Sequence, residues 1–386
     1  MKTATAFAAL DTRIREFIAH CCAHPLTTGE TAAQCDRVFN ELALAAFALQ
    51  VQYNQAYAVV CQRRGIKPGE VQAWGRIPAI PTAAFKELDF TCLLPEDRAR
   101  VFHSSGTSAQ QPSRHFHCAA SLALYEASLE PWFARHLLPE AASPVADRKL
   151  LLVSLTPPGN LAPHSSLVHM VETVMRRLGA PESQCCGCVA SAGEWELDPE
   201  RLLAALRQSM ECRQPVVLLG TAFNFVHLLD YFAQHDLRLA LAPGSRVMET
   251  GGYKGRSREV SKAELHAGIS RSLGVPAAQI IGEYGMCELG SQAYDATVAA
   301  PSPDGARVYQ FPPWCRVRIT SPESGQEVPE GQGGIVQLFD LANLYSVAAI
   351  QTGDLGIRRG QGFELLGRVG ALEPRGCSLM IKDMNP

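Results

Sequence analysis

Four short, mostly apolar runs, each followed by small or polar residues, constrain the fold of this chain more than any other feature. They are KLLLVSL (149–155), PVVLLG (215–220), SRVMET (245–250) and QIIGEY (279–284). Between them, residues 165–179 favour a helix, with serines at the start and arginines and a glycine at the end. Apolar runs that alternate with helices are typical of a largely parallel sheet covered on both faces. The sequence therefore predicts an α/β fold.

After about residue 306 the pattern changes to short strand-like segments separated by loops rich in Gly, Pro and Glu. These segments are ARVYQF (306–311), CRVRIT (315–320), GGIVQLFDL (333–341) and GFELLGR (362–368). Their spacing predicts a small β-barrel-like unit or meander. We therefore expect an α/β core over residues 1–305 and a small β subdomain of the same unit over residues 306–366.

The first sixty residues favour helices, and residues 42–62 among them carry no charge. This stretch contains the amides of Gln50, Gln52 and Asn54, which would be costly in the hydrocarbon of a bilayer. We therefore predict a soluble helix with a wide apolar face and no membrane span.

Composition excludes several classes of function. The 386 residues carry a formal net charge of −3, which gives no basis for binding nucleic acid or an anionic membrane surface. The thirteen cysteines are odd in number and scattered, unlike those of a small secreted disulfide scaffold. The N-terminal apolar stretch is too short for a signal peptide. We expect reduced thiols and a cytoplasmic protein.

The loop SSGTS (104–108) is the first candidate for a binding site. A glycine leaves backbone N–H groups unhindered, and hydroxyls add donors, which together suit phosphate oxygens. The loop carries no Walker, dinucleotide-binding or nucleophile-elbow pattern. From these residues alone, a phosphate cradle and a plain surface loop both remain open.

Three further residues follow predicted strands, where ligands gather in open α/β sheets. Glu288 offers a carboxylate that could hold Mg²⁺ beside phosphates, or it is a solvated acid. Tyr284 offers a flat ring for a base, or it belongs to the core. Asp354, in QTGDLG (351–356), is placed after a β segment, as a ribose ligand or a turn aspartate.

The order of these motifs resembles that of the adenylate-forming superfamily of acyl-CoA synthetases, adenylation domains and luciferases. Within it the chain is most similar to the LuxE-type acyl-protein synthetases, from about residue 74 onward. The segments that carry the resemblance are IPAIPTAAFK, VFHSSGTS, METGGYKG, EYGMCELGSQAY and LGRVGALEPRGCSL. The chain also resembles the truncated adenylating proteins of phenazine (D-alanylgriseoluteic acid) antibiotic biosynthesis.

The resemblance implies an adenylate-forming N-terminal domain whose C-terminal domain is truncated to a hinge and stub over residues 367–386. It implies that ATP and Mg²⁺ activate a carboxylic acid, either a fatty acid or an aromatic acid such as a phenazine carboxylate, as its adenylate. The implied ligands are Ser105, Gly106, Thr107 and Ser108 for phosphate, Gly251, Gly252 and Tyr284 for adenine, Asp354 for ribose, Arg368 at the hinge, and Glu288 for Mg²⁺. A carboxylate is already ionised, so positioning and charge neutralisation at phosphorus would carry catalysis.

The chain departs from the family pattern at three places. Cys287 stands where a threonine is usual, and a thiol is a poorer donor to phosphate than a hydroxyl. Ser113 and Arg114 end the phosphate loop where a lysine and a glycine are usual. The domain that normally supplies a catalytic lysine is missing, and Lys382 is not expected to replace it.

Cys377 matches the cysteine that accepts the acyl group in LuxE-type proteins, before transfer to a reductase. An accessible thiol beside an arginine favours nucleophilic reactivity, whereas one cysteine among many is usually inert. Two other functions remain open: a non-catalytic binder of acid or nucleotide that docks to a reductase, and a ligase that uses the thiol of CoA or a carrier protein. Turnover of ATP with acid separates the enzymes from the binder.

Overall fold

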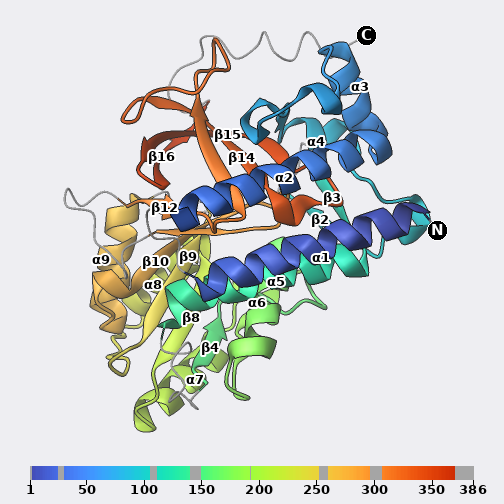
Figure 1. The fold of residues 1–386 in the computed structure, drawn as a ribbon. Helices are drawn as coiled ribbons and strands as arrows, with labels where there is room; N and C mark the ends of the chain where they lie inside the picture. Colours follow the sequence, from blue (N-terminus) through green and yellow to red (C-terminus); the bar gives the residue numbers. More distant parts are fainter. Residues whose placement is uncertain are drawn as a thin grey trace.

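The computed structural model describes residues 2–24, 30–104, 111–139, 149–191, 193–251, 260–295 and 307–369. Its centre is a twelve-stranded sheet in the order β13-β14-β15-β16-β12-β11-β10-β9-β8-β4-β5, with β1 paired to β15 (Figure 1). The α/β fold predicted from the sequence is confirmed.

One half of the sheet is parallel, as the apolar runs predict. The four runs form β4 (Leu151–Ser154), β8 (Val216–Thr221), β9 (Arg246–Thr250) and β10 (Ile280–Tyr284), and the short β5 (Gln184–Cys185) lies at the edge. Each neighbouring pair among these strands runs parallel. Their carboxyl ends therefore meet at one edge, where ligands bind in sheets of this kind.

Helices cover both faces of the parallel strands. The alternation of side chains along β8 shows this directly: Val217 and Leu219 pack in one apolar cluster, and Val216 and Leu218 pack in another. The first cluster includes α5 (Ala119–Leu137) and α6 (Ser166–Leu178). The second includes α7 (Pro199–Glu211), α8 (Ala222–Gln234) and α9 (Lys262–Leu273).

Two helix starts follow the sequence signals. Ser165 caps α6 by accepting a hydrogen bond from the backbone N–H of Val168. Thr221 caps α8 and forms a reciprocal capping box with Asn224. Both caps satisfy backbone groups that a helix N-terminus leaves unpaired, which fixes where each helix leaves the sheet.

The other half of the sheet is antiparallel. It runs from β11 (Ala293–Asp295) and β12 (Tyr309–Gln310) to β16 (Gly362–Arg368), β15 (Ala349–Arg359), β14 (Gly333–Asp340) and β13 (Cys315–Thr320). Strands β13 to β16 form the predicted meander, which is hydrogen-bonded through β12 and β11 to the parallel half. The domain boundary predicted between residues 305 and 306 lies outside the described residues and stays a prediction.

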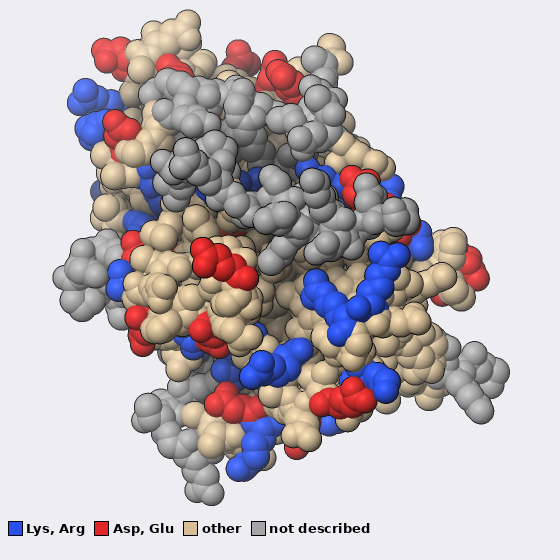
Figure 2. All heavy atoms as spheres, turned by 90° about the horizontal axis from the view of Figure 1, so that it is seen from above, with Lys and Arg blue, Asp and Glu red and all other residues tan. Residues whose placement is uncertain are grey.

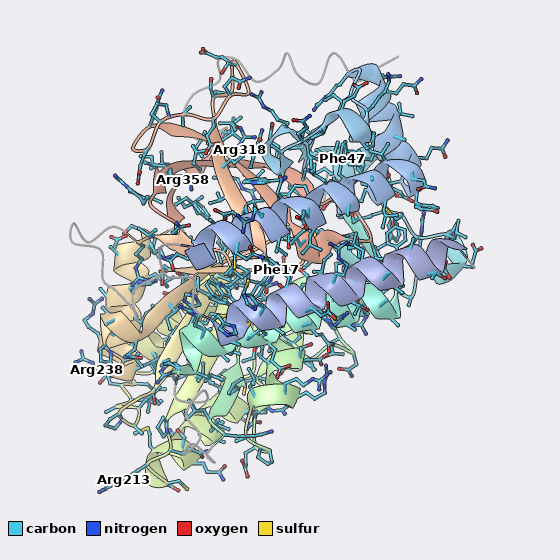
Figure 3. All side chains as sticks on the ribbon, in the orientation of Figure 1. Phe17, Phe47, Arg213, Arg238, Arg318 and Arg358 are labelled. Atoms are coloured by element: carbon cyan, nitrogen blue, oxygen red, sulfur yellow. The ribbon has the colours of Figure 1, made fainter. Side chains whose placement is uncertain are left out.

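The N-terminal helices are α1 (Lys2–Ala23), α2 (Glu30–Tyr53) and α3 (Gln55–Arg63). They pack on the meander and on α5, and Phe17 and Phe47 point into the resulting interior (Figure 3). The prediction of one helix over residues 42–62 is wrong, because Asn54 separates α2 from α3. Its side chain accepts from the N–H of Tyr57 and thereby starts a new helix.

Polar partners account for the buried amides in this layer. The Gln50 side chain donates to the carbonyls of Asn343 and Leu344 at 2.9 and 3.1 Å and accepts from the N–H of Ala348 at 3.1 Å. Among the described residues, no helix is both long and apolar enough to cross a membrane. On the face shown in Figure 2, basic and acidic side chains are interspersed among uncharged ones.

Residues 76–86, which are rich in proline, also contain regular structure. It contains β1 (Ile80–Pro81), which pairs in parallel with β15, and the short α4 (Ala84–Glu87). The following loop leads to the hairpin of β2 (Arg100–His103) and β3 (Arg114–His117), which forms a separate two-stranded sheet.

Candidate active site

The structure describes five of the predicted site residues: Gly251, Tyr284, Glu288, Asp354 and Arg368. The predicted residues that lie outside the described ranges are Ser105, Gly106, Thr107, Ser108, Gly252 and Cys377. The described residues form two groups, one around Tyr284 and one around Glu288.

Tyr284, Asp354 and Arg368 form the first group. The Tyr284 hydroxyl donates to Oδ2 of Asp354 at 2.8 Å, and Nε of Arg368 lies 3.4 Å from Oδ1 of the same carboxylate. The Arg368 side chain is 81% exposed, so this ion pair is open to solvent. Burial raises the pKa of Tyr284 well above its usual value, which keeps the phenol protonated and able to donate.

The sequence predicts that Asp354 follows a strand. In the structure Asp354 lies inside β15, opposite Arg368 of β16. Gly353, which precedes Asp354, is also part of the strand, and a side chain there would meet open space. Asp354 is therefore not a turn aspartate.

Aromatic side chains surround Tyr284. Its ring meets Phe363 and Phe311 edge-on, with centroids 5.3 and 6.0 Å away, and Tyr309 lies 5.9 Å away. The residue is 8% exposed. The ring therefore packs in the core, while its hydroxyl reaches Asp354, and its contact with a base stays a prediction.

Glu288 is the centre of the second group. It is 5% exposed, and its oxygens accept from the Ser113 hydroxyl (Oε1, 2.6 Å) and the Cys287 thiol (Oε2, 3.1 Å). Within the described part of the chain, no cationic side chain forms an ion pair with it. A buried carboxylate without a cationic partner is costly unless a ligand supplies the charge. Glu288 is therefore not the solvated acid of the simpler interpretation.

The β2–β3 hairpin connects the predicted phosphate loop to Glu288. Ser104 and Ser113, which flank the predicted loop in the sequence, are hydrogen-bonded to each other. His115 on β3 donates from Nδ1 to the Cys287 carbonyl at 2.5 Å. Burial lowers the pKa of His115, so the neutral imidazole makes this bond. These hydrogen bonds hold the β2–β3 hairpin beside Cys287 and Glu288, which are far away in the sequence.

Ser113 is a site residue that sequence reasoning missed. In the sequence it stands out only as a departure from the family pattern, and its partners Cys287 and Glu288 lie more than 170 positions away. Its position directly after the loop was the available signal. Arg114, the other departure at the end of the loop, pairs with Asp89 through Nη2 at 2.8 Å.

Glu283 is a second residue that was missed. It is buried beside Tyr284 and accepts a hydrogen bond from Thr250, which precedes Gly251. Burial raises the pKa of Glu283 to about 7. Its carboxylate lies over Gly285, where any side chain would collide with it. Gly251 itself has a φ of 70° at the end of β9, which glycine adopts without strain.

The donor set around Glu288 fits magnesium. Among the described residues, no cluster of three or more His, Cys, Asp or Glu side chains could form a complete protein cage for a metal. Magnesium does not need one, because it commonly uses one or two carboxylates, substrate phosphates and water. A single buried carboxylate at the base of a predicted phosphate loop is suited to that mode.

A family comparison matches nearly the whole chain. The family described as "Acyl-protein synthetase, LuxE" matches residues 14–385. The chain is 23% identical over 357 residues to the long-chain-fatty-acid–luciferin-component ligase of Vibrio harveyi, with 88% of this chain and 86% of that protein covered.

Solved structures show the same fold. An open conformation of 2-hydroxyisobutyryl-CoA ligase, in complex with 2-HIB-AMP and CoA, gives a TM-score of 0.61 at 14% identity, covering 88% of this chain and 77% of that one. The same ligase in its thioesterification state gives 0.62 at 15% identity, covering 88% and 69%. The architecture is therefore that of the adenylate-forming enzymes.

Proposed function

The chain belongs to the LuxE family of acyl-protein synthetases, and we propose that it activates a long-chain fatty acid as the acyl adenylate. Family membership makes it a carboxylate-activating ligase, and adenylate-forming enzymes take ATP as a substrate. The fatty-acid class is supported by the name of the Vibrio harveyi relative, a long-chain-fatty-acid–luciferin-component ligase.

One observation carries the assignment of the site: the Ser113–Glu288 hydrogen bond of 2.6 Å. It joins the end of the predicted phosphate loop to a buried carboxylate that lacks a cation among the described residues. Together the two elements make a place for a phosphate chain and a divalent ion. We assign the magnesium role to Glu288 on this basis, and magnesium would supply charge neutralisation of the ATP phosphates there.

The remaining roles follow from position. Asp354 would accept hydrogen bonds from the ribose hydroxyls, with Tyr284 and Arg368 fixing its carboxylate. Gly251 and Gly252 would pass close to adenine, after β9. The backbone and hydroxyls of residues 105–108 would contact the β- and γ-phosphates.

The reaction needs no general base. An ionised substrate carboxylate attacks the α-phosphorus of ATP, a new oxygen–phosphorus bond forms, and the bond to the β-phosphate breaks to release pyrophosphate. The chain's own residues hold ATP and the carboxylate in line.

Cys377 is proposed as the acyl acceptor. Its thiolate attacks the acyl carbonyl, a thioester forms and AMP leaves with the bonding pair. The thioester is then available to a reductase or another acceptor. The family name, acyl-protein synthetase, supports a protein-bound acyl group.

Acid-dependent exchange of pyrophosphate into ATP tests the proposal. Long-chain fatty acids, benzoates and phenazine carboxylates are compared with Mg²⁺ present. Exchange with fatty acids alone is expected. Exchange with aromatic acids alone would overturn the fatty-acid class in favour of the phenazine-type substrate that the sequence resemblance also raises. No exchange with any acid, despite calorimetric ATP binding, would overturn the ligase proposal in favour of a non-catalytic binder.

A further inference from the structure

We propose that Ser113 is a positioning residue that holds the Glu288 carboxylate ready for the divalent cation of the ATP complex. The proposal rests on the cation-binding role proposed above for Glu288. It assigns to Ser113, which directly precedes β3, a hydroxyl contact that Cys287 cannot make with equal strength.

The backbone beside Glu288 is fixed without Ser113. The Asn343 side chain donates to the Glu288 carbonyl at 2.6 Å, and His115 donates to the Cys287 carbonyl. The freedom that remains is rotation of the Glu288 side chain about its own bonds. Hydrogen bonds to the carboxylate oxygens restrict that rotation, and their described side-chain donors are Ser113 and Cys287.

The two donors differ in strength. The Ser113 hydroxyl lies 2.6 Å from Oε1, a short distance typical of a hydroxyl on a carboxylate. The Cys287 thiol lies 3.1 Å from Oε2, and a thiol is a weak donor. Ser113 therefore contributes most of the orientation. A carboxylate has about four lone-pair positions, so one hydrogen bond to each oxygen leaves room for a cation.

Ser113 is itself held rigidly. It is 1% exposed, and its backbone N–H donates to Oγ of Ser104 at 2.9 Å. Its hydroxyl also lies 3.3 Å from Sγ of Cys287, which completes a triangle of Ser113, Cys287 and Glu288. This geometry makes Ser113 the outer-shell partner of a proposed cation ligand. Such partners tune cation affinity although they do not touch the ion.

Binding of Mn²⁺, followed by electron paramagnetic resonance with a non-hydrolysable ATP analogue, tests the proposal without turnover. We expect Ser113→Ala to weaken Mn²⁺ binding about tenfold, the scale typical of losing an outer-shell partner. In acid-dependent exchange, the KM for Mg²⁺ should rise while the KM for the acid stays unchanged. Ser209→Ala is the matched control, since Ser209 is also 1% exposed and donates to the Leu206 carbonyl at 2.8 Å, away from the site.

A rescue variant separates orientation from folding. Cys287→Ser places a hydroxyl beside the other oxygen of Glu288, so the double variant Ser113→Ala/Cys287→Ser should recover most of the Mn²⁺ affinity. A purely structural loss at Ser113 would not be reversed in this way. Failure of the double variant to recover, with its fold intact by circular dichroism, would overturn the proposal.

Glu288→Gln distinguishes this proposal from the one it rests on. Loss of Mn²⁺ binding in Glu288→Gln, with wild-type binding in Ser113→Ala, would overturn the role of Ser113 and leave that of Glu288 in place. Unchanged binding in Glu288→Gln would overturn both.

Discussion

The Tyr284 hydroxyl and the Asp354 carboxylate, 70 residues apart in the sequence, are joined by a hydrogen bond of 2.8 Å. Tyr284 ends the last parallel strand, and Asp354 lies in the antiparallel meander. The bond therefore crosses between the two halves of the sheet at the place where we assign the ribose.

Asp354→Ala should weaken ATP binding. Removing the acceptor eliminates the proposed ribose contacts and leaves the Tyr284 hydroxyl without its partner, so we expect the KM for ATP to rise by about tenfold or more. The KM for the acid should change little. Tyr57→Phe is the control, because it removes another buried hydroxyl contact, the 2.7 Å bond to the Pro78 carbonyl, which involves none of the proposed site residues. An unchanged KM for ATP in Asp354→Ala would remove Asp354 from the site.

Cys377→Ser should abolish acylation of the protein but not acid-dependent exchange, because adenylation precedes thioester formation. A radiolabelled fatty acid with ATP gives the readout, with hydroxylamine sensitivity identifying the thioester. Cys212→Ser, at an exposed cysteine on the surface, should keep the label. Label that persists on Cys377→Ser would assign the acyl group to another residue or an external thiol.

The stability contributed by the buried histidines should fall with pH below about 6.5, because these side chains are neutral in the fold. Burial lowers the pKa of His136 to about 4, as it does for His169. The unfolded chain takes up these protons at its ordinary pKa, so the contribution of each histidine is complete above about 6.5 and is lost as pH falls toward 4. One such histidine lowers the free energy of unfolding by about 2 kcal/mol when the pH falls from 7.5 to 5.

Urea unfolding at pH 7.5 and 5 checks this with His136→Phe, which removes one titrating ring from a site beside Trp132 and Tyr294. The variant should lose about 2 kcal/mol less than wild type on acidification. Comparing the variant with wild type separates the effect of His136 from the effects of Glu283 and Asp340, which both proteins contain. Burial raises the pKa of these carboxyls to about 7 and about 6, so their contribution to stability falls as pH rises. Equal losses in both proteins would contradict a neutral buried His136.

Lys262→Met should destabilise the fold. Nζ of Lys262 lies 2.8 Å from Oε1 of Glu249, a carboxylate 4% exposed, and His266 lies 3.2 Å from the same oxygen. Removing the ammonium leaves a buried charge without its main partner, and because Lys262 is partly exposed we expect a loss of about 2 kcal/mol in the free energy of unfolding. Chemical denaturation measures it. The double variant with Glu249→Gln should be less destabilised than the sum of the single variants, and strict additivity would show that the pair is not coupled.

Four strands of the parallel half could be predicted because each is a mostly apolar run buried on two faces, as in β8. The break at Asn54 could not, because an amide that caps a helix looks the same in sequence as an amide on a helix surface. Asp354 was misplaced for a related reason, since the neighbouring glycine is equally compatible with a turn and an open strand position.

In the candidate site, too, some residues could be predicted from a local pattern and others could not. Glu288 and Tyr284 were identified because their motifs recur in a known order. Ser113 was not, because its importance comes from Oγ reaching a carboxylate 175 positions away, and that contact depends on how the hairpin packs against the segment that follows β10. Single contacts between distant segments are set by tertiary packing, which no local pattern encodes.

The bonds from Gln50 to the β14–β15 connection bear on the order in which the protein can be built. Gln50 and Asn343 are 293 positions apart, so α2 leaves the ribosome long before its polar partners are synthesised. Until residue 348 has emerged, the Gln50 amide can be satisfied only by water. The packing of the N-terminal helices therefore cannot be completed until β14 and β15 have been synthesised. A nascent chain arrested before that point carries an N-terminal layer that is not fully packed.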